Sequence, residues 1–543
     1  MAGERRNDSK VTARLAASGS VPIFHSILHN HTLRPMTATD LEAIIRIDAQ
    51  AFGAERLRMI EEFARIGSVA VIEREKVIQG FAFFWPWPGN RACYRALRGT
   101  RPSASTVWQA GPSVEAIAMK LVPYWLDTAP KFSGARQGPI EGDYDVAVVG
   151  GGFTGLSASI ALAKKGARVI LLEAGSIGGC ASGRNGGMCN NGFAQDYAAM
   201  AGLLGADVAE RLYRGFNLAV DTVERIISEE DIECDFRRVG KLKMAARPAH
   251  YDKLARSQEL MARGADPDSY LVSRADMASE VGTDRYHGGL IFPRSAAMHM
   301  GRFAHGLATA GARHGVTLHE NAPVLGLKRL NGHAHSLSTP SGTVTAKQIL
   351  LATGTSAVGP LAYFRRRIVP VGAFLIVTEP LSIEHLDHLL PRRRNATDTR
   401  NFVSYFRVTP DNRLLFGGRA RFAKSNARSD VKSGAVLRRS MVEIFPSLSG
   451  ARIDYCWGGM VDMTADRLPR AGEHNGLFYA MGYSGHGTQM STHMGQIMAQ
   501  VMDGNSNLNP WGDFDWPAIP GHFGPTWFLP FVGAYYKLQD ILH

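Results

Sequence analysis

Short apolar runs alternate with amphipathic segments through the middle of this 543-residue chain. Residues 146–149 and 169–172 are uninterrupted runs of Val, Ile, Leu and Ala, which is typical of strands buried on both faces of a sheet. Between them, residues 154–165 have helical spacing, and Gly166 suits the residue that follows a helix. This pattern predicts a β-α-β unit.

The rest of the second half alternates in the same way. Helical spacing predicts a long amphipathic helix over 206–230 and another helix over 302–314, followed by a strand at 316–319. Strands and hairpins dominate 366–454. A final strand at 477–481 leads into a glycine turn and a helix with Met490, Met494 and Met498 on one face. The fold class predicted is α/β, a Rossmann-type part with an antiparallel-sheet part.

The N-terminal region has a different character. Residues 32–85 read as a strand, a helix that begins near Asp40 and a hairpin, which predicts a small α+β extension. We place that extension at 1–120 and the main unit at 121–543. Within the main unit, the nucleotide-binding parts are expected at about 143–235, 300–358 and 455–505. The substrate-domain parts are expected at about 236–299 and 359–454, and an aromatic tail at 506–543.

Composition narrows the classes of function. Hydrophobic residues make up 45% and charged residues 20%, as in ordinary globular enzymes. The net charge of +12 is spread along the chain, and no nucleic-acid-binding motif accompanies it. The five cysteines form no CxxC pair, so neither a metal site nor a disulfide framework is expected. The N-terminus lacks an apolar signal core and no apolar run is long enough to span a bilayer, so a cytoplasmic location is expected.

The first turn of the β-α-β unit carries a nucleotide-binding motif. Gly150, Gly152 and Gly155 have the GxGxxG spacing that permits a tight turn, close approach to a pyrophosphate and close packing of helix on strand. Glu173 ends the second strand, where a carboxylate can accept hydrogen bonds from ribose hydroxyls. The whole array is more specific than the glycines alone, and it predicts a dinucleotide site.

The last array of the chain favours FAD as that dinucleotide. Gly482, Gly485 and Gly487 form a turn between strand 477–481 and the final helix. This turn presents a second helix N-terminus, which can stabilise the negative charge that a flavin gains on reduction. An ordinary final β-α unit remains the alternative.

Four motifs in this order resemble one family. They are the GGGFTG turn with Glu173, ASGRNGG at 181–187, LLATG at 350–354 and GYSGHG at 482–487. The chain resembles the D-amino-acid-oxidase (glutathione-reductase-2) class of flavoproteins from about residue 122 onward, and within it the γ-glutamylputrescine oxidoreductase-like branch. Separately, residues 32–87 resemble the first half of a GCN5-type acetyltransferase whose acyl-CoA loop is not found downstream.

The flavoprotein resemblance implies noncovalent FAD and assigns residues to it. Pyrophosphate would lie on the three glycines of the first turn, and the adenosine ribose on Glu173. Val324 would meet adenine through its backbone, and the pyrimidine end of the flavin would meet Gly485, His486 and Gly487. Further FAD contacts are expected from Ser182, Arg184, Asn185, Gly186, Gly187, Thr353 and Gly354.

The implied reaction is oxidation of a C–N bond in a small amine or amino acid. The hairpin within 404–419 would form the substrate wall, and alternation places Tyr405 and Arg407 on one face. We expect Arg407 to bind a substrate carboxylate, Tyr405 to close the pocket, Arg419 to lie near the flavin and His486 to orient it. A surface hairpin with exposed arginines is the alternative.

The electron acceptor stays open between oxygen and a quinone or other carrier. A second class of function, a non-catalytic regulator that binds flavin or CoA, also stays open, although both flavin motifs are intact. The aromatic tail is expected to pack on the chain's own core, with membrane contact as the alternative. No nucleic-acid partner is expected.

Overall fold

The computed structural model describes residues 119–543, apart from 331, 333, 357, 422, 423 and 543, and the backbone of three short strands nearer the N-terminus. The chain divides into two units, Met1–Val114 and Glu115–His543. The strands of the first unit pair antiparallel in the order β1, β2, β3. They span β1 (Thr32–Pro35), β2 (Val69–Arg74) and β3 (Val77–Phe83). The predicted hairpin is therefore present, whereas the helix predicted near Asp40 lies outside the described residues.

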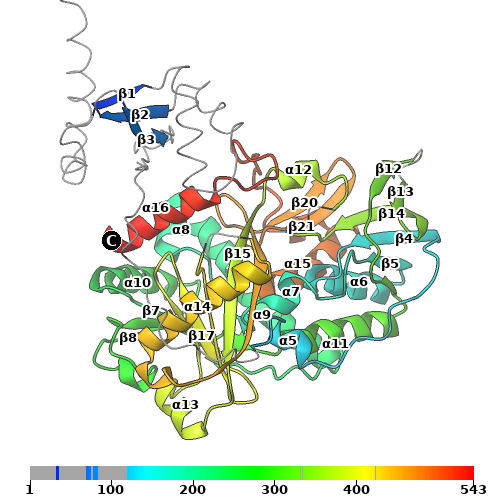
Figure 1. Cartoon of the computed structure of the whole chain (residues 1–543). Helices are drawn as coiled ribbons and strands as arrows, with labels where there is room; N and C mark the ends of the chain where they lie inside the picture. The colour runs from blue at the N-terminus through cyan, green and yellow to red at the C-terminus, as the bar shows by residue number, and fades with distance from the viewer. Residues whose placement is uncertain are drawn as a thin grey trace, which may run out of the picture. The chain divides into compact units, whose positions relative to one another are not determined.

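The second unit contains a mixed eight-stranded sheet, which we call the nucleotide sheet (Figure 1). Six of its strands are hydrogen-bonded in the order β11, β5, β4, β14, β13, β12. In addition, β21 pairs with β14, and β20 pairs with β21. The strands β11, β5, β4, β14 and β21 run parallel, as the predicted β-α-β unit requires. The bounds are β4 (Gly142–Val149), β5 (Val169–Leu172), β11 (Thr317–His319), β12 (Gly326–Arg329), β13 (His335–Thr339), β14 (Gly342–Leu351), β20 (Arg470–His474) and β21 (Leu477–Met481).

Three helices that pack together accompany this sheet: α6 (Phe153–Lys164), α11 (Met300–Arg313) and α15 (Gly487–Val501). The approach of α15 to α6 depends on Gly495, because a Cβ there would lie 2.5 Å from the Thr154 carbonyl oxygen. The Thr154 hydroxyl also lies 2.7 Å from the Tyr483 hydroxyl. The start of α6 and the turn before α15 are thereby held together, although more than three hundred residues separate them in sequence.

A second eight-stranded sheet, which we call the substrate sheet, has the order β19, β15, β18, β17, β16, β7, β9, β8. All its pairs are antiparallel except β16 with β7. The bounds are β7 (Lys241–Met244), β8 (Tyr270–Val272), β9 (Gly289–Phe292), β15 (Val369–Thr378), β16 (Asn395–Asp398), β17 (Ser404–Val408), β18 (Leu414–Gly418) and β19 (Ile453–Met463). Strand β19 keeps the chain in this sheet beyond residue 454, where the sequence placed the return to the nucleotide part.

Helices missed by the sequence pattern lie within the stretch 366–454. They are α13 (Ile383–Leu389) and α14 (Ala427–Ile444), and α14 packs on β15 and β19 (Figure 1). The amphipathic helix predicted over 206–230 is confirmed as α9 (Ala206–Glu229). The remaining elements are α5 (Tyr124–Asp127), α7 (Ala181–Arg184), β6 (Met188–Cys189), α8 (Tyr197–Leu204), α10 (Pro248–Met261), η2 (Met277–Ser279), β10 (Ala296–Ala297), α12 (Ala362–Arg365), η4 (Pro446–Leu448), η5 (Ser506–Leu508) and α16 (Leu529–Leu542).

The aromatic tail packs on the chain itself. Trp511 is only 1% exposed and joins the main hydrophobic core, and Trp516 joins the cluster beneath the nucleotide sheet. In α16, the Asp540 carboxylate accepts hydrogen bonds from the backbone N–H groups of Asn401 and Phe402 at 2.8 and 2.7 Å. The tail's alternative use, membrane contact, finds no support here. None of the helices in the described residues is long and apolar enough to cross a membrane.

Candidate functional site

One large cavity collects residues from both sheets of the second unit. Its volume is about 1280 Å³, above the range of about 300–1,000 Å³ usual for a pocket that holds one small ligand. Val149, Leu172 and Ala352 line it at the carboxyl ends of β4, β5 and β14, where α/β sheets bind ligands. The cavity therefore has room for a dinucleotide and a substrate.

Most of the residues predicted from sequence line this cavity. They are Gly150, Gly152, Glu173, Ser182, Arg184, Asn185, Gly186, Val324, Thr353, Gly354, Tyr405, Arg419, Gly485, His486 and Gly487. Gly155, Gly187 and Arg407 do not line it.

The first glycine turn is shaped by close backbone contacts. Gly150 has φ +113°, and a Cβ there would lie 2.5 Å from the Ala352 carbonyl oxygen. A Cβ on Gly155 would lie 2.0 Å from the Gly150 carbonyl oxygen, so Gly155 lets α6 pack against the strand turn. Gly152 is the N-cap of α6 without a side-chain cap. The positive end of α6 is thus presented to the cavity, as an anionic pyrophosphate requires.

Glu173 occupies the position expected for a ribose ligand. Its two carboxylate oxygens accept hydrogen bonds from the backbone N–H groups of Gly151 at 2.6 Å and Gly175 at 2.8 Å. These bonds fix the carboxylate at the cavity wall. Each oxygen keeps a lone pair with which it can accept a hydrogen bond from a ribose hydroxyl.

Residues 182–187, which we call the flavin stretch, run along the cavity wall, and their own side chains hold them in place. Ser182 Oγ accepts a hydrogen bond from the Phe153 N–H at 3.1 Å, which joins this stretch to the first turn of α6. Arg184 donates to the carbonyl oxygens of Gly179 and Gly458. Asn185 Oδ1 accepts from the Gly187 N–H at 2.8 Å.

The turn before α15 forms the opposite end of the cavity. His486 is the N-cap of α15, and its Nδ1 is buried without a hydrogen-bond partner among the described residues. Burial, together with the charges of Lys241 and Lys243, lowers the pKa of His486 to about 3. A neutral imidazole fits an orienting role better than a proton donor at neutral pH.

A half-buried carboxylate that the sequence pattern did not single out, that of Asp462, supports this turn. Asp462 of β19 accepts a hydrogen bond from the Gly482 N–H at 2.7 Å, and burial raises its pKa to about 6. Asp462 also lines the cavity, so the substrate sheet helps to shape the flavin turn.

The substrate sheet supplies the facing wall. Tyr405 lies against the flavin stretch, since a Cβ on Gly186 would come within 3.1 Å of its ring. Gly417 on the adjacent strand leaves room for the same ring, because a Cβ there would lie 2.3 Å from it. Arg419 lines the cavity and donates to the Asn401 carbonyl oxygen at 3.2 Å. Burial raises the pKa of Tyr405 and lowers that of Arg419.

The expectation that Arg407 binds a substrate carboxylate is wrong. Its guanidinium is 3% exposed and donates to the carbonyl oxygens of Gly187 and Met298. It also lies over the Trp125 ring, 5.5 Å from the centroid. Alternation placed Arg407 on the same strand face as Tyr405, but the flavin stretch covers that end of the strand. Arg407 therefore supports this stretch from behind.

Two further cavity residues, Lys241 and Lys243, lie on β7, and the sequence pattern did not single them out. Lys241 is 5% exposed, and its ammonium donates to the Asn191 carbonyl oxygen at 2.7 Å. Lys243, on the same strand face, forms an ion pair with Asp196. Two lysines at alternate positions in a short apolar strand are a signal that could have been noticed, because strand lysines normally face solvent.

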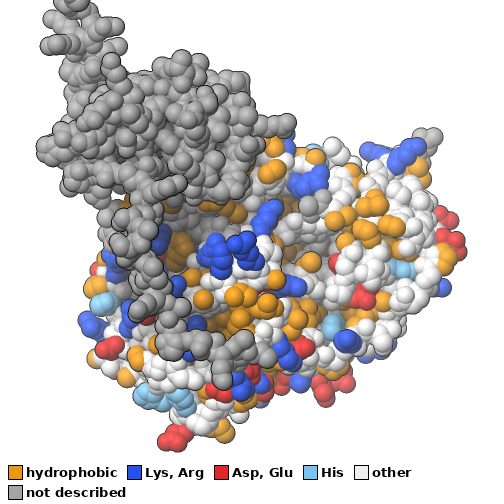
Figure 2. Space-filling model, viewed as in Figure 1, with side chains coloured by type: hydrophobic (Ala, Val, Ile, Leu, Met, Phe, Trp, Pro, Cys, Tyr) orange, Lys and Arg blue, Asp and Glu red, His pale blue; other side chains and the backbone are white. Residues whose placement is uncertain are grey.

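The +12 net charge is not evenly presented at the surface. Figure 2 shows Lys and Arg side chains gathered in the middle of one face, next to apolar side chains. Arg400 and Arg467 join the two lysines among the cavity-lining residues. Asp196 and Asp398 also line the cavity and pair with Lys243 and Arg400, so part of this positive charge is neutralised within the wall.

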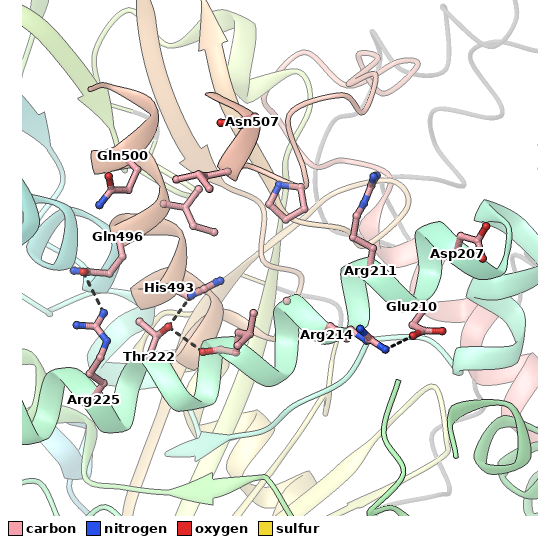
Figure 3. Close-up of a pocket in the computed structure, with 15 residues that line it drawn as sticks. Asp207, Glu210, Arg211, Arg214, Thr222, Arg225, His493, Gln496, Gln500 and Asn507 are labelled. Atoms are coloured by element: carbon pink, nitrogen blue, oxygen red, sulfur yellow. Dashed lines mark hydrogen bonds and ion pairs between the residues drawn. The ribbon is translucent and has the colours of Figure 1, made fainter. Parts of the chain in front are cut away.

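A second hollow lies along α9 and α15, with a volume of about 780 Å³ (Figure 3). It contains none of the residues expected to bind FAD. Polar groups of its wall pair with one another, such as Arg214 with Glu210 and His493 Nδ1 with Thr222 at 2.8 Å. It offers no glycine turn that could hold a pyrophosphate.

The first cavity fits FAD on its own chemistry. It combines an uncapped helix start, a glycine turn without side chains, a ribose carboxylate and a second helix start at its other end. Of the cysteines in the described part of the chain, only Cys180 lines the cavity, and burial together with the charge of Glu173 raises the pKa of its thiol. The family resemblance implies that FAD is bound there without a covalent link.

Comparison with known proteins agrees with this geometry. The family described as FAD dependent oxidoreductase (DAO) matches residues 145–501. Gamma-glutamylputrescine oxidoreductase of Escherichia coli K12 is 32% identical over 405 residues, which cover 73% of this chain and 93% of that protein. Probable oxidoreductase OrdL of Haemophilus influenzae is 32% identical over 367 residues, covering 66% and 83%.

Solved structures share the fold. L-proline dehydrogenase from P. horikoshii has a TM-score of 0.58 at 19% identity, covering 68% of this chain and 98% of that chain. Glycine oxidase from Geobacillus kaustophilus has a TM-score of 0.55 at 22% identity, covering 70% and 98%. The fold class and the cofactor predicted from sequence are confirmed, whereas the acetyltransferase resemblance of residues 32–87 finds no support. This chain belongs to the DAO family and is an FAD-dependent oxidoreductase.

Proposed function

We propose that this enzyme oxidises a C–N bond in a small amine or amino acid that also carries a carboxylate. The observation that carries the proposal is Lys241. Its ammonium lies in the cavity wall supplied by the substrate sheet, and no carboxylate among the described residues pairs with it. A buried cation without a counter-ion costs stability unless a ligand provides one.

The surroundings of Lys241 favour an anionic ligand. Its Nζ lies 3.8 Å from the centroid of the Phe292 ring. Burial, together with the neighbouring charge of Lys243, lowers the pKa of Lys241 to about 7. A bound carboxylate would restore the charged form, because an opposite charge at close range raises the pKa of an amine.

The reaction itself places modest demands on the side chains. FAD, when bound, would accept a hydride, which is one proton with two electrons, from the carbon next to the substrate nitrogen; the nitrogen gives up a proton, and water then hydrolyses the imine product. The substrate nitrogen must be neutral for this step. A buried cavity wall disfavours the ammonium form and thus lowers the substrate pKa. Tyr405 and Phe292 supply the apolar part of this wall.

Within this class, a γ-glutamyl-polyamine is the leading candidate. Such a compound offers an amine to oxidise at one end and a carboxylate at the other. Two considerations support it: the 32% identity to a protein named gamma-glutamylputrescine oxidoreductase, and the Lys241 side chain in the cavity wall.

The experiment is a substrate screen without oxygen, followed by the bleaching of flavin absorbance. The panel should contain γ-glutamylputrescine, N-glutarylputrescine, N-acetylputrescine, putrescine, glycine, sarcosine and proline. N-acetylputrescine keeps the amide and the terminal amine but lacks both the carboxylate and the α-ammonium group of the glutamyl end, so N-glutarylputrescine, which lacks only the α-ammonium group, completes the matched set. We expect faster bleaching with γ-glutamylputrescine than with N-acetylputrescine. Equal rates for this pair would refute carboxylate recognition, and no bleaching with any amine would refute the proposed reaction.

The acceptor is tested separately, by oxygen uptake in air and by turnover with a quinone or dye under nitrogen. Turnover only with the quinone or dye would make the protein a dehydrogenase. If the protein is a regulator that only binds flavin, none of the tested compounds should bleach the flavin absorbance. The intact turn at 482–487 argues against this alternative.

A further inference from the structure

Three buried side chains donate hydrogen bonds to backbone carbonyl groups of the flavin stretch, and none of the three lines the cavity. Trp457 Nε1 donates to the Arg184 carbonyl oxygen at 2.9 Å, and Trp125 Nε1 donates to the Asn185 carbonyl oxygen at 2.7 Å. The guanidinium of Arg407 donates to the Gly187 carbonyl oxygen. Both indoles are 0% exposed. The three donors come from α5, β17 and β19, which are remote from one another in sequence.

These bonds orient the peptide planes of the stretch. A trans peptide places the N–H of one residue opposite the carbonyl of the residue before it. With the Asn185 carbonyl turned toward Trp125, the Gly186 N–H points away from Trp125. Gly186 lines the cavity, and its N–H has no acceptor within the described part of the chain. The Gly187 N–H, by contrast, is occupied by Asn185 Oδ1.

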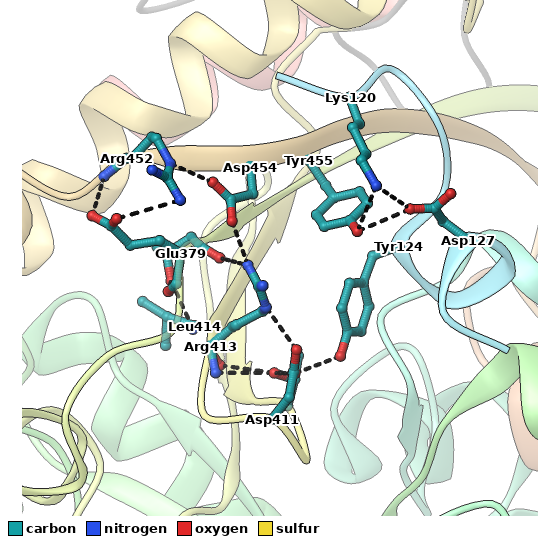
Figure 4. A network of polar contacts seen from close by, with 12 residues as sticks. Lys120, Tyr124, Asp127, Glu379, Asp411, Arg413, Leu414, Arg452, Asp454 and Tyr455 are labelled. Carbon is teal, nitrogen blue, oxygen red and sulfur yellow. Dashed lines mark hydrogen bonds and ion pairs between the residues drawn. The ribbon is translucent and has the colours of Figure 1, made fainter. Parts of the chain in front are cut away.

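Trp125 reaches this position only because α5 is anchored. A helix of four residues has little stability of its own. Its neighbours hold it on both sides (Figure 4): Tyr124 Oη donates to Asp411 Oδ1 at 2.5 Å, and Asp127 accepts from Tyr455 Oη at 2.9 Å. Arg413 extends the network by pairing with both Asp411 and Asp454. The segment before residue 145, outside the matched family region, is thus tied to the substrate sheet.

We infer that Trp125, Trp457 and Arg407 are positioning residues that hold the 184–187 backbone so that the Gly186 N–H is presented to the flavin. A main-chain donor fixed in a shielded cavity stabilises negative charge without reorganisation. Since reduction makes the flavin more negative, this donor raises the reduction potential of the bound FAD. The inference concerns the cofactor alone and does not depend on which substrate is oxidised.

The test uses the FAD-loaded enzyme and chemical reduction by dithionite, so no substrate is needed. Trp125→Phe and Trp457→Phe each remove one N–H donor and keep an aromatic ring. We expect each variant to bind FAD about three- to tenfold more weakly, as the loss of one buried hydrogen bond implies. We also expect each to shift the flavin absorbance band and to move the reduction potential to a more negative value.

The matched control is Trp511→Phe. Trp511 is equally buried at 1% exposure, but its Nε1 has no hydrogen-bond partner among the described residues. This variant loses the same atoms and should leave the reduction potential unchanged. Arg407→Lys, which can keep one bond to the Gly187 carbonyl, should lie between wild type and Arg407→Met.

Two results would overturn the inference. One is an unchanged potential and spectrum in both Trp125→Phe and Trp457→Phe. The other is an equal shift in Trp511→Phe, which would make the effect one of general packing. Because the two tryptophans lie on different elements, failure of one variant to fold leaves the other as a decisive test.

Discussion

The two walls of the cavity are built in different ways. The nucleotide wall consists mainly of backbone: a glycine turn, two helix starts and the 184–187 stretch. The substrate wall consists of side chains from β7, β16 and β17, including Lys241, Lys243 and Tyr405. A backbone wall needs particular glycines at fixed spacing, whereas a side-chain wall needs only strands that meet in the fold. The residues of the nucleotide wall can therefore be predicted from a short sequence motif, whereas those of the substrate wall cannot.

The largest expected effect comes from a substitution in the nucleotide wall that prevents FAD binding. Gly152→Val should abolish FAD binding, because a Cβ there already lies 2.9 Å from Ser182 Oγ and a branched side chain would fill the pyrophosphate's place. The measurement is the flavin absorbance of the purified protein. Gly202→Val is the matched control, since a Cβ at Gly202 on α8 meets nothing within 4 Å. Normal FAD content in Gly152→Val would show that the turn does not hold the pyrophosphate.

Two N-terminal truncations test which of the residues before the first glycine turn are needed for FAD binding. Deletion of residues 1–114 should leave FAD binding intact, because the second unit starts at Glu115. Deletion of residues 1–128 should weaken or abolish FAD binding, since it removes Trp125 and the backbone bonds of Lys120 to Asp454 and Cys456. FAD titration of both proteins compares them. Equal affinity in both would show that α5 plays no part in the site.

The next effect concerns the substrate wall alone. Lys241→Met should lower kcat/KM for a carboxylate-bearing amine by about 30- to 150-fold, the loss expected for a charge-assisted hydrogen bond of about 2–3 kcal/mol. The uncharged analogue should change much less, and FAD affinity should stay near wild type. Lys253→Met, at an exposed position on α10, is the surface control. Arg407→Lys, in contrast, should affect both substrates alike, because Arg407 faces the flavin stretch.

The smallest expected effect is a pH dependence of substrate preference that arises from the titration of Lys241. Its pKa is lowered to about 7, mainly by burial, so the free enzyme loses this positive charge as pH rises through about 7. The ratio of kcat/KM for the acidic substrate to that for its uncharged analogue should fall over the same range. Taking the ratio cancels the titration of the substrate amine, which both compounds share. A ratio that stays flat in wild type, or that falls equally in Lys241→Met, would contradict the assignment.

The sequence could indicate most residues of the nucleotide wall for a physical reason. Gly150, Gly152 and Gly155 act through their own backbone, so local spacing determines their geometry. The long helix α9 followed from its periodicity in the same way. Arg407 was misplaced because alternation gives the strand face but not what covers it, here the 184–187 stretch. Lys241 was missed because its burial arises from pairing with β16 and β9, which lie well beyond it in sequence.

The most direct test of this account is a structure of the enzyme with FAD and an unreactive carboxylate-bearing amine analogue. The account predicts the pyrophosphate at the start of α6, the Gly186 N–H directed at the flavin, and the ligand carboxylate within hydrogen-bonding distance of Lys241 Nζ. A carboxylate bound to other groups, with Lys241 left facing only Asn191 and Phe292, would contradict the proposed substrate wall. FAD bound anywhere other than between the two walls would contradict the account as a whole.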